Sequence, residues 1–148
     1  MGRIAGFSMI ELIVVIVVLG ILAAVAIPRM TGLDIYRGLE FRDRTVAALR
    51  YAQKTATSHR RHVCVAFTPA TVTLTIAAAQ GNAAACDTAL NIPGAPANVL
   101  VSPDATNVVF TAGHAAPLDF FTDGTSGGTV LSIAGQANIV VATTGYVQ

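Results

Sequence analysis

The residues that suggest a chemical or binding role lie together at the N-terminus. Gly6 and Phe7 open a long apolar run in which Glu11 is the single charged residue, and residues 12–28 carry no charge at all. A carboxylate in a membrane helix costs on the order of 2.5 to 3.5 kcal/mol to insert at the helix centre, and less near the helix end. The position of Glu11 therefore requires a positively charged partner.

The apolar run is long enough to cross a membrane. Residues 7–27 make up 21 residues, which at about 1.5 Å per helical residue span roughly 32 Å, close to the thickness of the hydrocarbon core of a bilayer. The run predicts a transmembrane helix.

Two general interpretations of this segment stay open. In a secretory signal peptide, Arg3 would supply the positive start and the Ala-Val-Ala of residues 24–26 a cleavage site. Against this, Glu11 interrupts the junction before the apolar region, and Pro28 would lie just after the cut. An ordinary anchor helix is the second interpretation, and it leaves Glu11 unexplained.

A third interpretation accounts for every residue. The sequence Gly-Phe-Ser-Met-Ile-Glu at residues 6–11 resembles the class III leader junction of type IV prepilins and pseudopilins. In that family a prepilin peptidase cuts after the glycine and methylates the new N-terminal phenylalanine. The resemblance implies cleavage after Gly6, N-methylation of Phe7 and an assembly role for Glu11, whose carboxylate would neutralise the Phe7 amine of a neighbouring subunit in a low dielectric.

Composition and charge restrict the rest of the chain to a single compact domain beyond the anchor. Of the 148 residues, 53% are hydrophobic and 11% are charged, which is too apolar for a disordered chain. All nine Lys and Arg residues lie at or before Arg61, whereas residues 62–148 contain four aspartates and no Lys or Arg. The C-terminal part should therefore be mildly acidic.

The sequence contains two cysteines, Cys64 and Cys86. If the N-terminus is an anchor, both lie outside the cytoplasm, where an oxidising environment favours a disulfide between them. Two buried, unpaired cysteines are the alternative.

A second helix should follow the anchor, with Pro28 interrupting the helical path because it lacks an amide donor. Apolar residues then recur at multiples of three and four as far as residues 57–59, which predicts an amphipathic helix. The positions in this stripe are Ile35, Leu39, Val46, Leu49, Ala52 and Ala56.

From residue 62 the hydrophobic period changes to two, as in β-strands. Residues 63–67 and 71–76 predict a hairpin, and residues 77–98 predict a loop held to the first strand by Cys86. Short strands separated by turn residues are expected at 99–102, 108–111, 118–122, 130–133 and 138–142.

The predicted fold class is α+β and pilin-like: a long N-terminal helix whose apolar half spans the membrane and whose amphipathic half packs on an antiparallel sheet, called the head. The expected boundaries are 1–6 for the leader, 7–28 for the transmembrane helix, 29–60 for the amphipathic helix and 61–148 for the head. Residues 48–53, the hairpin, and the combination of 139–141 with 144–145 resemble the GspH/FimT-type minor pilins and pseudopilins.

Catalytic and cofactor sites are not expected. The stretch 124–128 fits the pattern G-x-S-x-G, but the predicted strand after it is incompatible with a nucleophile elbow, and no histidine follows in the chain. His59, His62 and His114 could converge on a metal, and Asp119 and Asp123 could contribute to a calcium loop. Structural roles at a helix end and in a turn are the simpler interpretation, so neither metal nor cofactor is predicted.

The resemblance implies a structural, non-enzymatic minor pilin or pseudopilin of a type IV pilus or a type II secretion pseudopilus. Its partners would be prepilin peptidase, other subunits of the filament and the inner membrane, with the head in the periplasm before assembly and the chain in a filament or at the cell surface after it. A DNA-uptake minor pilin is the alternative. DNA is not an expected partner, because the acidic head offers only Arg60 and Arg61 as a basic patch.

Overall fold

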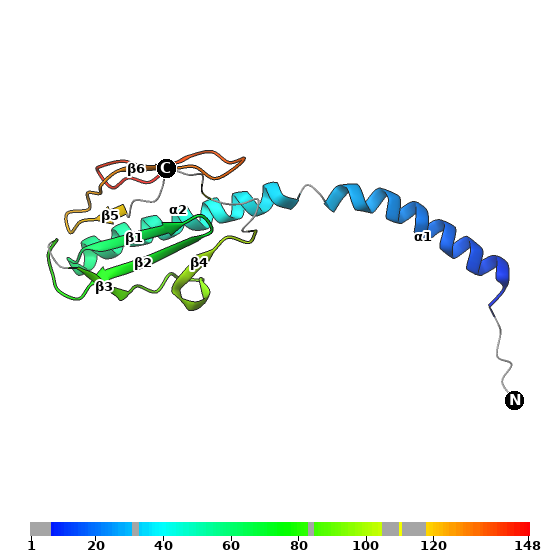
Figure 1. Cartoon of the computed structure of the whole chain (residues 1–148), viewed down its shortest axis with the longest axis horizontal. Helices are drawn as coiled ribbons and strands as arrows, with labels where there is room; N and C mark the ends of the chain where they lie inside the picture. The colour runs from blue at the N-terminus through cyan, green and yellow to red at the C-terminus, as the bar shows by residue number, and fades with distance from the viewer. Residues whose placement is uncertain (1–6, 31–32, 83–84, 105–109, 111–117) are drawn as a thin grey trace, which may run out of the picture. The chain divides into compact units, whose positions relative to one another are not determined.

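A computed structural model describes residues 7–30, 33–82, 85–104, 110 and 118–148. The chain forms two compact units, Met1–Leu33 and Asp34–Gln148. Figure 1 shows the helix of the first unit in blue and the helix and strands of the second from cyan to red. Each unit is described by itself below.

The first unit contains the apolar helix α1, Met9–Met30. Its first turn is closed by the carbonyl of Ser8, which accepts hydrogen bonds from the amides of Glu11 at 3.1 Å and Leu12 at 3.2 Å. The helix continues through Pro28 to Met30, and the next helix begins at Leu33. Pro28, where the sequence predicted an interruption, therefore lies within α1, and the helix does not end at this proline.

Helix α2, Leu33–His59, lies in the second unit from Asp34 onward. It ends where Arg60 adopts a left-handed conformation, with φ of 51°, and the amide of Arg61 bonds back to the carbonyl of Ala56 at 3.2 Å. This is the hydrogen bond of a Schellman-type helix end. The end of the helix agrees with the predicted 57–59.

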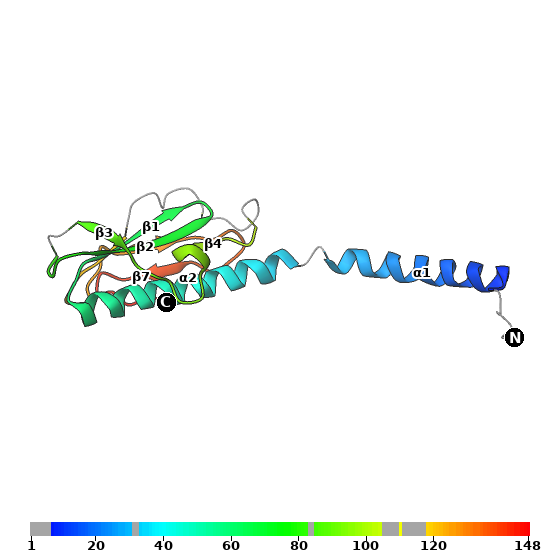
Figure 2. The ribbon, with the colours of Figure 1, turned by 90° about the horizontal axis from the view of Figure 1, so that it is seen from below.

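The buried face of α2 is shorter than the predicted stripe. Leu49, Ala52 and Ala56 are fully buried, but 69% of Ile35 and 49% of Leu39 are exposed. Figures 1 and 2 show the strands lying over the C-terminal part of α2, so the first turns of the helix extend beyond them. The prediction that Ile35 and Leu39 lie on the face that packs on the head is therefore wrong for a single chain without neighbouring subunits.

The head is built on the predicted hairpin, β1 (Val63–Thr68) and β2 (Thr71–Ala77). Strand β5 (Leu118–Phe120) pairs with the other edge of β1, while β3 (Cys86–Ala89) and β4 (Val99–Val101) both pair with β2. Strands β6 (Thr129–Leu131) and β7 (Ile139–Val141) form a separate two-stranded sheet. All of these strand pairs are antiparallel.

The loop predicted at residues 77–98 differs from the structure, and the strand predicted at residues 108–111 lies mostly outside the described residues. The predicted loop 77–98 contains β3 and a short 3₁₀ helix, Pro96–Asn98. Because most of β3 is exposed, it lacks the apolar alternation that identifies a strand in sequence. The expected strand 108–111 lies outside the described residues except for Phe110, which pairs with Ile133.

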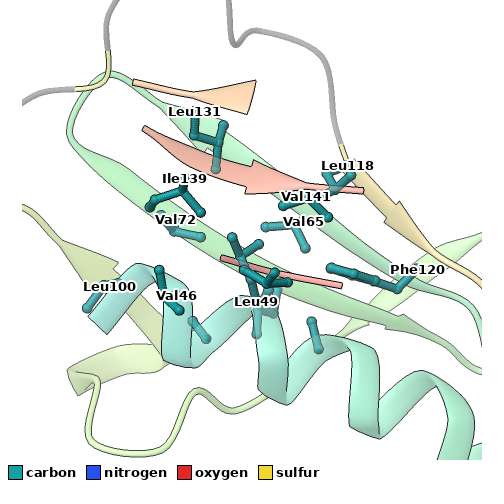
Figure 3. Packing of buried hydrophobic residues seen from close by; sticks show 14 of the residues in the cluster. Val46, Leu49, Val65, Val72, Leu100, Leu118, Phe120, Leu131, Ile139 and Val141 are labelled. Carbon is teal, nitrogen blue, oxygen red and sulfur yellow. The ribbon is translucent and has the colours of Figure 1, made fainter. Parts of the chain in front are cut away.

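One hydrophobic core joins α2 to both sheets. Figure 3 shows Val46 and Leu49 of α2 facing residues of the strands, among them Val65, Val72 and Ile139. Within α2, the buried hydroxyl of Thr45 donates a hydrogen bond to the carbonyl of Phe41 at 2.8 Å, so it needs no partner from the core. The predicted arrangement of an apolar helix, a second helix and an antiparallel sheet is confirmed.

Polar side chains of α2 hold the C-terminal part of the chain by donating to backbone carbonyls. Arg42 Nε donates to Ala137 O at 2.9 Å, and Arg50 Nη2 donates to Val147 O at 3.0 Å. Gln53 Nε2 donates to Gly124 O at 3.2 Å. The hydrophobic face and these polar contacts together fix the second sheet against the helix.

Candidate functional site

The N-terminal segment places the charge of Glu11 at the start of the apolar helix. Glu11 lies in the first turn of α1, where the unpaired amides favour a negative side chain. Phe7 precedes the helix and is 78% exposed. Gly6, the residue before the predicted cut, lies outside the described residues.

The apolar surface of residues Met9–Ala26 in this helix is available for contact with lipid or protein. The 18 residues of Met9–Ala26 are long and apolar enough to cross a membrane, and none of them is buried within the chain. Such a surface is incompatible with water over its full length. The sequence-based expectation of a segment able to span a membrane agrees with this geometry.

Cys64 and Cys86 form a disulfide, which confirms the pairing that the sequence favoured. The bond joins the middle of the head, β1, to the edge strand β3 across the intervening β2. Because β3 buries little apolar surface, this covalent link is a major restraint on its position.

Removal of the disulfide should destabilise the folded unit. The two cysteines are 22 residues apart, and in the chain-entropy model closing a loop of this size contributes about 3 kcal/mol. We expect the double variant Cys64→Ser, Cys86→Ser of residues 34–148 to lose roughly that much free energy of unfolding in urea. An unchanged urea midpoint and slope would contradict this role.

His62 lies beside the disulfide, which the sequence did not indicate. Its Nδ1 is 3.9 Å from Cys64 Sγ and 3.8 Å from Cys86 Sγ, and its ring stacks on Phe121 with centroids 5.4 Å apart. Its Nε2 is 3.4 Å from Asp119 Oδ1. These contacts depend on the pairing of β1 with β5 and of β2 with β3, so the sequence spacing could not have revealed them.

The other histidines considered as metal ligands do not join His62 in the described structure. His59 is exposed at the end of α2, and His114 lies outside the described residues. The combination of the three histidines, an alternative that the sequence did not favour, therefore has no support from the part of the chain that is described.

The two aspartates considered for a calcium loop each have a structural partner. Asp123 Oδ1 accepts hydrogen bonds from the hydroxyl of Thr125 at 2.6 Å and from its amide at 2.9 Å, while Asp119 faces His62. The hydroxyl and then the amide of Thr125 hold the pKa of Asp123 below its usual value. These contacts form a side-chain-stabilised turn at Gly124, the role that the sequence favoured.

Ser126, the central residue of the G-x-S-x-G pattern, is held by hydrogen bonds to backbone groups. It is buried, its hydroxyl donates to Ala142 O at 2.8 Å, and the amide of Gly128 donates to its Oγ at 3.1 Å. A strand, β6, follows at Thr129. The hydroxyl thus links the turn to the second sheet instead of being presented on a strand-to-helix elbow.

The basic residues after α2 lie in a surface of mixed charge. Arg60 lines an open depression together with Thr57, Gln80 and Asp123. A neighbouring carboxylate weakens the attraction of this surface for phosphate.

Comparison with known proteins identifies the class of the N-terminal segment. Residues 1–27 match the family described as the prokaryotic N-terminal methylation motif. The match covers the predicted cut, Phe7, Glu11 and most of α1. The chain therefore carries the sequence pattern of a prokaryotic N-terminal methylation motif.

Among individual proteins, the chain is similar to the type IV narrow pilus major component PilA5 of Thermus thermophilus, with 46% identity over 55 residues. The match covers 37% of this chain and 47% of that relative, so the chain spans about half of the relative's length.

Solved structures of the type IV minor pilin FimU of Pseudomonas aeruginosa, in two crystal forms, give TM-scores of 0.49 and 0.48. Their sequence identities are 17% and 16%, over 76% of this chain and 89% and 84% of those chains.

Proposed function

We propose that this chain is a structural, non-enzymatic subunit of a type IV pilus or a related secretion pseudopilus. The observation that carries the proposal is the methylation motif over residues 1–27, with Glu11 in the first turn of an apolar helix. Prepilin peptidase would cut after Gly6 and methylate the amine of Phe7. The subunit would wait in the inner membrane with its head in the periplasm, and would then enter a filament.

Charge neutralisation gives Glu11 a direct role in assembly. The new amine at Phe7 is a positive charge near the end of an apolar helix, and Glu11 is a negative charge one turn along it. A carboxylate on one subunit can pair with the amine of the next, and an unpaired charge in this layer would be costly. The pairing would set the axial register between subunits.

The finer assignment is to the GspH/FimT-type minor subunits. Its support is the resemblance of residues 48–53 and of the C-terminal segment to that group. The division into a leader of residues 1–6, a filament-core helix of 7–28, an amphipathic helix of 29–60 and a head of 61–148 belongs to this proposal. A DNA-uptake function is not favoured, because residues 62–148 contain no Lys or Arg.

The proposal is tested by locating the chain in filaments sheared from the cell surface or assembled from the secretion system. We expect mass spectrometry of purified filaments to find peptides of the head, and to lose them when prepilin peptidase is deleted. Peptides that remain in the membrane fraction alone, in cells that do assemble filaments, would argue against a filament subunit.

A further inference from the structure

We propose that reduction of the disulfide converts Cys64, Cys86 and His62 into a site for a thiophilic divalent metal ion such as Zn²⁺. Each of these residues offers one ligand atom, and the three atoms lie within 4.8 Å of one another. The same residues would then hold a disulfide in one redox state and a metal ion in the other.

The histidine is already placed for this role. Its Nδ1 lies 3.9 Å and 3.8 Å from the two sulfur atoms. Tetrahedral zinc, with bonds of about 2.3 Å to sulfur and 2.0 Å to nitrogen, places its nitrogen and sulfur ligands roughly 3.6 Å apart. Nε2 lies 3.9 Å from Cys64 Sγ as well, but Nδ1 is the nitrogen within reach of both sulfurs.

The carboxylate of Asp119 supplies the outer contact that metal-binding histidines usually have. Asp119 stands opposite Cys64 in the pairing of β1 with β5, and its Oδ1 is 3.4 Å from His62 Nε2. A proton on Nε2 directed at this carboxylate leaves Nδ1 unprotonated, with its lone pair available to a metal ion after a small rotation of the ring. Stacking on Phe121 also fixes the plane of the ring.

The chemistry of the switch balances in two steps. A dithiol reductant transfers two electrons and two protons to the S–S bond, becomes a disulfide itself and leaves two thiols. The metal then binds both sulfurs as thiolates and releases their two protons. Rotation of the cysteine side chains, whose Cα atoms are 6.1 Å apart, separates the sulfurs, and water completes the three protein ligands.

Such a metal would hold β3 to β1 in the reduced chain, as the disulfide does in the oxidised chain. The site lies near the surface, since 12% of the His62 side chain is exposed, so an ion can reach it.

The test titrates Co²⁺, a spectroscopic substitute for Zn²⁺, into the full-length chain in detergent, either untreated or reduced with a phosphine. The phosphine supplies two electrons and becomes its oxide with oxygen from water, whose protons go to the thiols. We expect a thiolate-to-cobalt charge-transfer absorption that saturates at one equivalent in the reduced chain, is abolished by Zn²⁺, and is absent from the oxidised chain.

Variants separate this site from metal binding by cysteines in an unfolded chain. Asp119→Asn should weaken Co²⁺ binding by about tenfold through the loss of its contact with the histidine, and His62→Gln should weaken it at least as much. His59→Gln, at the exposed end of α2, is the matched control and should bind as the unaltered chain does. Equal absorption in the oxidised chain, no absorption on reduction, or affinity unaffected by both His62→Gln and Asp119→Asn would overturn the proposal.

Discussion

Replacing Gly145 by alanine should reduce the free energy of unfolding of residues 34–148 by about 3 kcal/mol or more. Gly145 has φ of +82°, where a Cβ atom costs roughly 1–2 kcal/mol. That atom would also lie 1.9 Å from the carbonyl oxygen of Gly124 and 2.5 Å from Gln53 Nε2. The backbone at Gly124 must then shift, and overpacking of this kind typically costs about 1–3 kcal/mol.

The position of Gly145 makes the loss of free energy of unfolding larger than backbone strain at this residue alone would cause. Gly124 O accepts the hydrogen bond from Gln53 Nε2 that joins α2 to the turn, so a shift of this carbonyl also weakens that contact. Urea unfolding followed by circular dichroism measures the loss through the midpoint and slope of the transition.

Gly135→Ala is the matched control. Gly135 also has a positive φ, +72°, but among the described residues no heavy atom beyond Gly135 and its two chain neighbours lies within 4 Å of the Cβ that alanine would add. We expect the free energy of unfolding of this variant to fall by only about 1–2 kcal/mol, the cost of placing a Cβ atom on a residue with positive φ. Equal losses for the two variants would show that the close approach of residues 124 and 145 does not contribute to stability.

Glu11→Gln should reduce entry into the filament at least tenfold while leaving membrane insertion intact. Glutamine keeps the size of the side chain but removes the charge, so the amine of Phe7 in the neighbouring subunit would stay unpaired in a low dielectric. A tenfold reduction corresponds to about 1.4 kcal/mol, well below the cost of an uncompensated buried charge. The measurement is the ratio of this chain in sheared filaments to that in the membrane fraction.

The control for this variant is Glu40→Gln, which removes another helical carboxylate. Glu40 forms an exposed ion pair with Arg44 at 2.7 Å, and such surface pairs contribute about 0–1 kcal/mol. We expect Glu40→Gln to enter filaments normally. Normal incorporation of the Glu11→Gln chain would remove the assembly role proposed for Glu11.

Elements with a strong hydrophobic period could be predicted from the sequence. The hairpin of β1 and β2 follows from apolar residues at every second position, and the end of α2 follows from the end of the apolar stripe on the helix. In both cases apolar residue types mark the buried face. Strand β3 could not be predicted, because most of its residues are exposed and carry no apolar alternation, and its position depends on pairing with β2 and on the disulfide. Ile35 and Leu39 show the opposite case: the apolar pattern of α2 continues through residues that stay exposed, beyond the part of the helix that the described strands cover.

The same distinction applies to the two candidate sites. Phe7 and Glu11 lie a few residues apart in one segment, so their motif can be read directly from the sequence. The contacts of His62 with Cys86 and Asp119 join residues that are far apart in the chain, and they exist only after β3 and β5 have joined the sheet. Sequence spacing contains no signal for such a group.

Mass spectrometry of the intact mature chain tests whether the N-terminus is processed as proposed. We expect a chain that begins at Phe7 and carries one methyl group on its amine, and that becomes the uncut precursor when prepilin peptidase is absent. A mature chain that begins at Ile27 would show that residues 1–26 are a signal peptide, and a chain that keeps Met1 in cells with active peptidase would show an ordinary anchor. Either result would contradict the proposed processing.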